Sequence, residues 1–267
     1  MNSALPEKSF KFNINFDYYR NLFRGRLGAD MISLRLLMSA INDKSYAKFQ
    51  NHESKGFVFQ SAMPTLNQGL IEYETIKTFI SMMRNVNDYL DRMIAILNLS
   101  KKSIRVPTPM NLEEASKYAN SLLDEELSLY CQKTREEMKD KLKHFGELPP
   151  EFTKYITTYN LLRNCYEHHK AISQRGLQIP VKKMGLYTQD GKEVEIGKVI
   201  KGGSTISVKF TQKTIHIKKG QPALVTYEEL VSTELYLMLE VPLQIEKKVA
   251  EIIQGNRKSV PVAETVD

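Results

Sequence analysis

Apolar side chains recur at three- and four-residue steps over four stretches of the chain, and this spacing predicts amphipathic helices. The predicted helices span about residues 65–99, 111–146, 149–175 and 227–253. One face of the first is formed by Phe79, Met83, Val86, Leu90, Met93 and Leu97. The third has a comparable face, formed by Phe152, Tyr155, Tyr159, Leu162 and Tyr166. We expect these faces to pack together as the core of a helical bundle.

Two of the helix starts have sequence signals of their own. Asn111 and Glu114 have the spacing of a capping box, and so do Thr226 and Glu229. Gly146 favours the end of the second helix. The segment before these helices, about residues 17–49, is expected to form short helices that are broken near Gly25 and Gly28.

Two other regions alternate apolar and polar residues, which is typical of strands. Residues 10–16 predict a short N-terminal strand, with which residues 56–62 would pair. Residues 181–225 predict a hairpin or small meander with glycine turns. The predicted fold class is therefore mainly α: a helical bundle with a β-rich insertion before the last helix and a short N-terminal strand. We expect one domain over 1–254 and a disordered tail over 255–267.

Composition argues against several classes of protein. None of the 267 residues lies in an uncharged apolar stretch long enough for a membrane span, and no apolar leader marks a secretory signal. The two cysteines, Cys131 and Cys165, favour a reducing, cytoplasmic setting over a disulfide framework. Glycine-rich phosphate-binding motifs are absent, which argues against a Rossmann or P-loop enzyme.

Positive charge is concentrated in one segment of the chain. Residues 163–220 contain 12 Lys and Arg against 4 Asp and Glu, a net charge of +8, whereas the whole chain has +7. This concentration indicates a polyanion partner such as RNA. The alternative is that the predicted hairpin is simply a solvated, basic edge.

Polar residues near the end of the third predicted helix share one face. At 100° per residue, the arc contains Asn160, Arg163, Asn164, Glu167 and His168. Histidine can move a proton at neutral pH, and the arginine fork matches phosphate oxygens, so this arc could cleave RNA without a metal. One helix gives an incomplete site, whereas two copies around a twofold axis would bring two arcs together.

The string Leu162-Arg163-Asn164-Cys165-Tyr166-Glu167-His168 resembles the R-N-x-x-x-H signature of the HEPN superfamily. Those are small all-helical proteins of toxin–antitoxin, abortive-infection and other RNA-targeting defence systems. The resemblance implies Arg163, Asn164 and His168 as catalytic residues and a homodimer formed through the motif helix. It also implies a metal-independent endoribonuclease without a cofactor, whose 2′-hydroxyl attack leaves a 2′,3′-cyclic phosphate.

Glu167 departs from the family pattern, because many members have a small or aliphatic residue before the histidine. Its spacing allows an ion pair with Arg163 that either orients or neutralises the guanidinium. The alternative to catalysis is a HEPN-like protein that binds RNA, a nucleotide or a protein partner, or a purely structural subunit. His169 lies on the flank of the apolar face and is expected at the edge of the core. It is the second candidate for the catalytic histidine if His168 does not have that role.

The remaining candidates concern binding. Cationic residues that follow the motif are expected to bind RNA: Lys170, Arg175, Lys182 and Lys183. An antitoxin or another defence protein is the expected protein partner. Cys165 with His168 and His169 does not predict a metal site, since a second pair of ligands is missing. A nucleophilic role for Cys165 is not expected either, because it lies near the apolar face.

Overall fold

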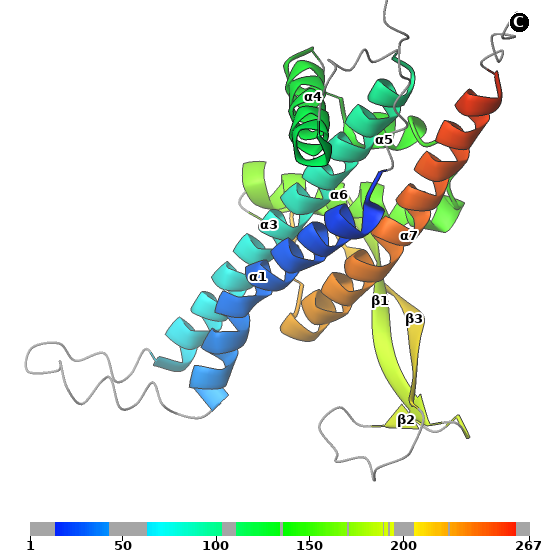
Figure 1. The fold of residues 1–267 in the computed structure, drawn as a ribbon. Coiled ribbons are helices and arrows are strands. Elements are labelled where there is room, and N and C mark those ends of the chain that lie inside the picture. Colours follow the sequence, from blue (N-terminus) through cyan, green and yellow to red (C-terminus); the bar gives the residue numbers. More distant parts are fainter. Residues whose placement is uncertain are drawn as a thin grey trace, which may run out of the picture. The chain divides into compact units, whose positions relative to one another are not determined.

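The computed structural model describes residues 14–42, 63–102, 111–133, 136–169, 171–188, 190–191, 193–194, 206–223 and 225–259. These residues form six helices and one small antiparallel sheet, which precedes the last helix, so the fold is mainly helical (Figure 1). The elements in chain order are α1 (Phe16–Asn42), α3 (Met63–Ser100), α4 (Leu112–Lys133), α5 (Met138–Lys143), α6 (Pro150–His168), β1 (Leu177–Thr188), β2 (Glu193–Val194), β3 (Ile206–Ile217) and α7 (Tyr227–Ser259).

The chain divides into two compact units. The first consists of Met1–Leu22, Asn87–Pro149 and Pro242–Asp267, and the second of Phe23–Val86 and Pro150–Val241. Helices α1, α3 and α7 contribute residues to both units. The single domain over 1–254 stays a prediction.

Aromatic side chains form much of the core of the second unit. The rings of Tyr159 and Tyr166 on α6 pack edge-on against Phe79 of α3, with centroid distances of 6.0 and 5.6 Å. On the same face of α6, Tyr155 packs against Tyr236 of α7 at 5.2 Å. All five residues of the predicted apolar face of α6 are buried, which confirms that prediction.

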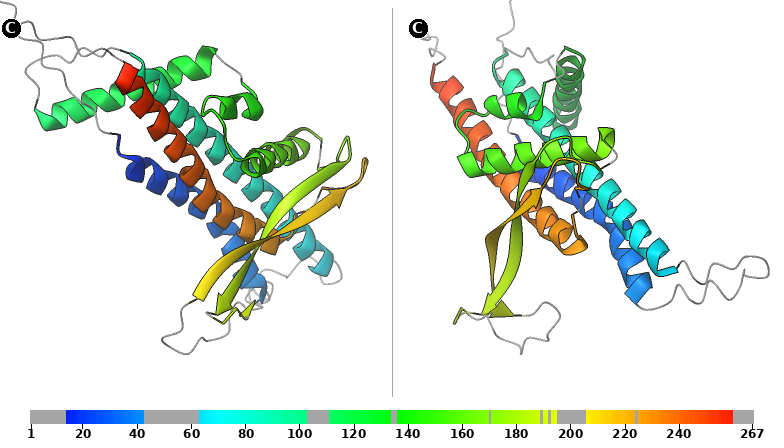
Figure 2. Two further views of the ribbon diagram at one scale, coloured as in Figure 1. Left: turned by 90° about the vertical axis from the view of Figure 1, so that its right-hand side faces the viewer. Right: turned by 180° about the vertical axis from the view of Figure 1, so that it is seen from behind.

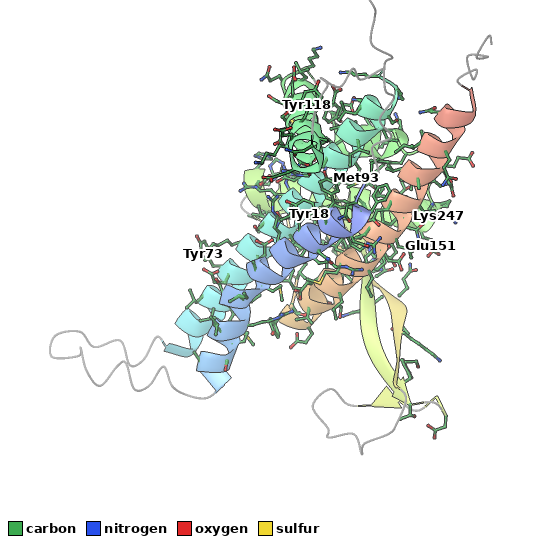
Figure 3. All side chains as sticks on the ribbon, viewed as in Figure 1. Tyr18, Tyr73, Met93, Tyr118, Glu151 and Lys247 are labelled. Atoms are coloured by element: carbon green, nitrogen blue, oxygen red, sulfur yellow. The ribbon has the colours of Figure 1, made fainter. Side chains whose placement is uncertain are left out.

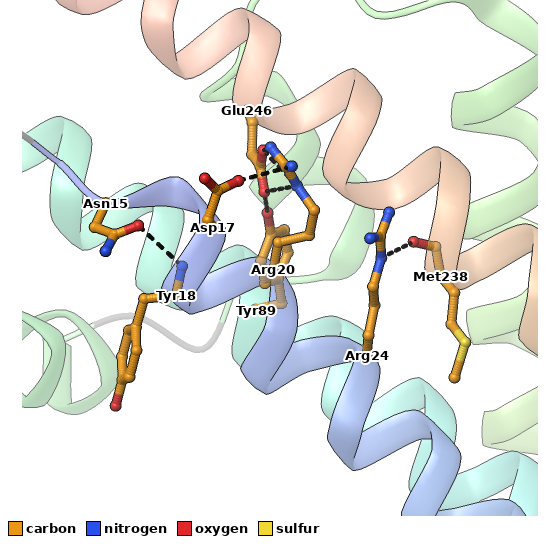
Figure 4. A network of polar contacts seen from close by, with 8 residues as sticks. All are labelled: Asn15, Asp17, Tyr18, Arg20, Arg24, Tyr89, Met238 and Glu246. Atoms are coloured by element: carbon orange, nitrogen blue, oxygen red, sulfur yellow. Dashed lines mark hydrogen bonds and ion pairs between the residues drawn. The ribbon is translucent and has the colours of Figure 1, made fainter.

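Buried polar contacts accompany the apolar core of the first unit. Glu246 on α7 accepts hydrogen bonds from the Tyr89 hydroxyl (2.7 Å) and from Arg20 Nε (3.1 Å), as Figure 4 shows. Lys141 on α5 forms a buried ion pair with Asp91 on α3, at 2.5 Å. Helix α3 also contributes the fully buried Met93 to this unit. Tyr73, on the part of α3 that belongs to the second unit, is 62% exposed (Figure 3). The whole predicted apolar face of α3 is buried.

The small sheet has the strand order β2-β1-β3. Strands β1 and β3 pair in register from Leu177 opposite Ile217 to Thr188 opposite Ile206, and they form a long twisted hairpin (Figure 2). The sequence correctly predicts β structure before the last helix. It places the start at residue 181, whereas β1 begins at Leu177.

Helix α1 is continuous, so the predicted breaks near Gly25 and Gly28 are wrong. Neither glycine has a positive φ. Contacts to other helices of the second unit stabilise the part of α1 that follows Leu22. Arg24 Nε donates to the Met238 carbonyl of α7 at 2.9 Å, and Asp30 accepts a hydrogen bond of 2.7 Å from Ser81 of α3. Such contacts outweigh the low helix propensity of glycine.

The second predicted helix is two helices, α4 and α5. Glu137, the residue before α5, has an extended backbone with φ −68° and ψ 155°. Next to it, the Glu136 carboxylate accepts a hydrogen bond of 2.9 Å from the Tyr130 hydroxyl and lies 2.8 Å from His144 Nε2. These side-chain contacts accompany the extended backbone before α5, where the apolar spacing alone predicted a continuous helix.

The third predicted helix ends at His168 and not near residue 175. Ala171 has a φ of 61°, which a continuing helix does not allow. Beyond it the backbone pairs with residues that precede α7: Ser173 N donates to Gln221 O at 3.1 Å, and Ala223 N donates to Ala171 O at 2.8 Å. Long-range backbone pairing therefore ends the helix early.

Both predicted capping boxes are confirmed. Glu114 N donates to Asn111 Oδ1 at 2.9 Å, and Asn111 N donates to Glu114 Oε2 at 3.0 Å. Before α7, Glu229 N donates to the Thr226 hydroxyl at 3.2 Å, and Thr226 N donates to Glu229 Oε2 at 3.0 Å. These capping boxes were predictable from the sequence because each needs only two residues three positions apart.

The two ends of the chain differ from the sequence prediction where the structure describes them. Phe16, the last residue of the predicted N-terminal strand, is the first residue of α1. Residues 10–13 of that strand and the whole of its partner, 56–62, lie outside the described residues. The tail is predicted to be disordered from Gly255, but α7 continues to Ser259.

Candidate functional site

The motif residues lie in the last two turns of α6. The helix starts with Pro150, and its buried face of aromatic and aliphatic side chains fixes its rotation against the core of the second unit. The opposite side therefore presents the polar arc. Along this arc the Arg163 side chain is 22% exposed, Asn164 is half-buried, and His168, the last residue of the helix, is exposed.

Arg163 is held by two residues of its own helix. Its Nε donates to Glu167 Oε2 at 2.8 Å, and its Nη1 donates to Asn160 Oδ1 at 3.4 Å. The ion pair between positions four apart is the one that the sequence allows. Neither contact uses Nη2 of the guanidinium. The guanidinium is therefore oriented by its own helix through two of its three nitrogens.

Arg84 on α3 is the functional candidate that the sequence analysis missed. Its Nη2 and Nε both donate to Glu167 Oε1, at 2.8 and 3.2 Å. The Arg84 side chain is 66% exposed, whereas that of Glu167 is 12% exposed. Arg84 and Glu167 are 83 residues apart, so no local sequence pattern connects them.

The two arginines govern the ionisation of Glu167. Burial opposes the charged carboxylate, but the hydrogen bonds and charges of Arg163 and Arg84 outweigh it and lower the pKa of Glu167 below its ordinary value. The carboxylate is therefore ionised at neutral pH. Two guanidinium groups and one carboxylate leave a net charge of +1 in this Arg84–Glu167–Arg163 cluster.

The two histidines lie next to each other at the end of α6. His168 and His169 are both exposed, and their ring centroids are 6.5 Å apart. His169 follows the helix and does not lie at the edge of the core, so that prediction is wrong, because α6 ends before it. Among the described residues, no hydrogen bond joins Arg163 to His168.

Cys165 lies on the buried side of α6. It is 4% exposed, and burial raises the pKa of its thiol. A thiol in this state is a poor nucleophile and a poor metal ligand. In the described part of the chain, no three His, Cys, Asp or Glu side chains are grouped so that they could hold a metal ion.

The predicted RNA-binding residues are only partly described. Arg175 is exposed in the segment between α6 and β1. Lys182 and Lys183 are on β1, where their backbones pair with Gln212 and Thr211 of β3. The side chains of these two lysines, and Lys170 as a whole, lie outside the described residues.

Further cations are present on the same sheet and the turn after it. Lys218 and Lys219 are exposed after β3, and Lys213 on β3 is 59% exposed and pairs with Glu229 at 2.9 Å. His216 is also exposed on β3. The described side chains on β3 and just after it therefore include three exposed lysines, and the polyanion partner that the charge distribution indicates stays a prediction.

Comparisons of the chain with family models, curated proteins and solved structures give no significant match. None of the described helices has the length and hydropathy that a membrane span requires. What the described geometry offers is a mainly helical scaffold with an oriented guanidinium, a net positive Arg–Glu–Arg cluster and an exposed imidazole on one helix end. These groups suit the binding of a phosphate and the movement of a proton.

Proposed function

We propose that this protein is a metal-independent endoribonuclease of the HEPN type that acts in defence or as a toxin. The observation that supports the proposal is the state of Arg163 and His168 on α6. One side chain is a guanidinium fixed by Glu167 and Asn160, and the other is an exposed imidazole five residues later. Together they supply the two functions that RNA cleavage needs without a metal.

The reaction is an attack of a ribose 2′-oxygen on the adjacent phosphorus. A bond forms between the 2′-oxygen and phosphorus, and the bond from phosphorus to the 5′-oxygen breaks. One imidazole takes the 2′-hydroxyl proton, and a second, protonated imidazole gives a proton to the 5′-oxygen. The products are a 2′,3′-cyclic phosphate and a 5′-hydroxyl.

Each protomer contributes one His168, so a homodimer with facing α6 helices would supply both imidazoles. Arg163 stabilises the charge of the pentacoordinate phosphorane through its fork. Asn164, one turn before His168, orients the imidazole or the phosphate. The basic hairpin attracts RNA to the site, with an affinity that falls as salt rises.

The test is cleavage of a short single-stranded RNA by the full chain. Arg163→Ala and His168→Ala are each expected to lower the cleavage rate by at least about a hundredfold and to remove the cyclic-phosphate product. Lys77→Ala, which removes a 62% exposed cation of α3 outside the motif and the hairpin, is the control and should cleave like the wild type. Unchanged cleavage by either motif variant contradicts the proposal.

A non-catalytic RNA-binding protein of the same class is the second candidate. The observation in its favour is the ion pair of Arg163 with Glu167, because a carboxylate competes with phosphate for the guanidinium. RNA binding by the wild type without any cyclic-phosphate product would establish this second function.

A further inference from the structure

The Glu167 carboxylate accepts hydrogen bonds from two guanidinium groups that lie far apart in the sequence. Arg163 approaches Glu167 from one turn earlier on α6, and Arg84 approaches it from α3. The two arginines use different oxygens, Oε2 for Arg163 and Oε1 for Arg84. Glu167 therefore sets the separation of the two cations and holds them in one place.

Neutralising Glu167 requires only one of these arginines. Arg163 is the less exposed of the two and already provides a direct ion pair with the carboxylate. Arg84 adds a second positive charge, with two thirds of its side chain in solvent. The surplus charge is consequently at the surface and next to the motif. An arginine fork at such a place suits an oxyanion of the phosphate type.

A fixed cation also binds an anion with less loss of freedom than a mobile one. Arg84 makes two hydrogen bonds to the same carboxylate oxygen, through Nη2 and Nε. Neither of them uses Nη1, so part of the fork is not engaged by the contact with Glu167. The side chain is therefore oriented before RNA arrives.

We propose that Arg84 is a second phosphate-binding residue of the site, which contacts an RNA backbone phosphate next to the one that Arg163 holds. The ligand is a phosphodiester of single-stranded RNA, and Glu167 acts as the positioning residue that separates the two guanidinium groups. This inference rests on the proposed function.

The experiment measures binding of a short fluorescent single-stranded RNA to the full chain. All proteins carry His168→Ala, so that the RNA is not cut. In this background Arg84→Ala is expected to weaken binding by about five- to tenfold. It should also lower the slope of log affinity against log salt by about 0.7, as expected for one lost phosphate contact on a single strand.

Lys77→Ala is the matched control. Lys77 is also an exposed cation of α3, 62% exposed, and it pairs with a carboxylate, that of Glu74 at 3.4 Å. Removing it changes the net charge by the same amount but leaves the Arg84–Glu167–Arg163 cluster intact. We expect its affinity and salt slope to match the background protein, and circular dichroism should show equal helix content in all variants.

A double-mutant cycle separates direct binding from an effect through Glu167. Glu167→Gln removes both the competing negative charge and the ion pairs that fix the two guanidinium groups, so the comparison that decides is made within this variant. If Arg84 contacts phosphate, Arg84→Ala still weakens binding severalfold when added to Glu167→Gln. Equal affinities of Glu167→Gln with and without Arg84→Ala would overturn the inference, since Arg84 would then act only on the carboxylate.

The outcomes also separate this inference from the proposed function. RNA cleavage by the wild type, together with unchanged binding in Arg84→Ala, overturns the role of Arg84 and leaves the endoribonuclease in place. A loss of affinity in Lys77→Ala equal to that in Arg84→Ala overturns it as well, because net charge alone would explain both. If neither the wild type nor the background protein binds or cleaves RNA, both proposals fail.

Discussion

Arg163 and Glu167 lie one turn apart on α6 and are joined by a hydrogen bond of 2.8 Å from Nε to Oε2. Both side chains are largely shielded, with 22% and 12% of their surface exposed. Glu167 also accepts hydrogen bonds from Arg84 of α3, so one carboxylate contacts two guanidinium groups. The Arg163–Glu167 pair is therefore part of a larger polar cluster and not an isolated surface contact.

The first prediction concerns acid stability. Glu167→Gln should lower the free energy of unfolding by about 1–2 kcal/mol at pH 7, because a neutral amide replaces the carboxylate that accepts three hydrogen bonds from two guanidinium groups. The folded protein lowers the pKa of Glu167 from 4.5, so this stabilisation is present above pH 4.5 and is lost as the pH falls below it. Urea unfolding of both proteins at pH 7 and pH 3.5 measures the difference.

Glu113→Gln is the control for that measurement. Glu113 forms an ion pair with Lys117 at the same four-residue spacing, but both side chains are about three quarters exposed. The change should cost less than about 0.5 kcal/mol at either pH. If Glu167→Gln costs no more than Glu113→Gln, the shielded pair does not stabilise the fold.

The second prediction distinguishes the two adjacent histidines. His168→Ala should lower RNA cleavage by at least about a hundredfold, whereas His169→Ala should retain most of it. His168 ends the helix that carries Arg163, while His169 lies beyond its last turn. Initial rates with one RNA substrate provide the comparison. The reverse order of activities would assign the proton transfer to His169.

The third prediction tests the continuity of α1. Gly25→Ala should raise the free energy of unfolding by about 0.5–1 kcal/mol, because alanine favours a helix and, apart from its chain neighbours and the adjacent helix backbone, no atom lies within 4 Å of the added Cβ. Gly146→Ala also replaces glycine by alanine, but at a φ of 72°, which alanine adopts only with strain. It should therefore lower the free energy of unfolding by about 1 kcal/mol. Opposite signs in thermal unfolding confirm the prediction, and a destabilising Gly25→Ala contradicts a continuous helix.

The fourth prediction concerns the buried ion pair of the first unit. Lys141→Met should cost about 3 kcal/mol at pH 7, because it leaves the Asp91 carboxylate buried without its cation. Burial already raises the pKa of Asp91 despite Lys141, and losing the cation raises it further. A protonated carboxyl carries no charge, so the cost should shrink as the pH falls from 7 to 4.

Lys143→Met, on the same short helix, is the matched control. Lys143 pairs with Asp140, but the side chains are 68% and 50% exposed. This change should leave the unfolding midpoint nearly unaltered at both pH values. A large cost in the control would mean that the charge of α5, and not burial of the pair, determines the effect.

Signals that depend on residues three or four positions apart were predictable from the sequence. The capping boxes at Asn111 and Thr226, and the apolar faces of α3 and α6, are of this kind, and the structure confirms them. The pairing of Arg163 with Glu167 also has this range. In each case the helical repeat alone brings the partners together.

Helix ends and breaks were harder to predict, because they depend on distant contacts. Pairing of the backbone near Ser173 with residues 221–223 ends α6 early, and contacts from α3 and α7 stabilise α1 across Gly25. The sequence shows the local preference at these positions but not the partner that overrides it.

For this protein the sequence by itself determined the mainly helical class, the β-rich segment before the last helix and the polar arc of α6. Only the tertiary structure decided which cations meet at Glu167. Arg84 is 83 residues from that carboxylate, and its approach depends on how α3 packs against α6 through Phe79, Tyr159 and Tyr166. The sequence periodicity determines which residues of α6 share a face. Which helix packs next to that face depends on the packing of the whole unit.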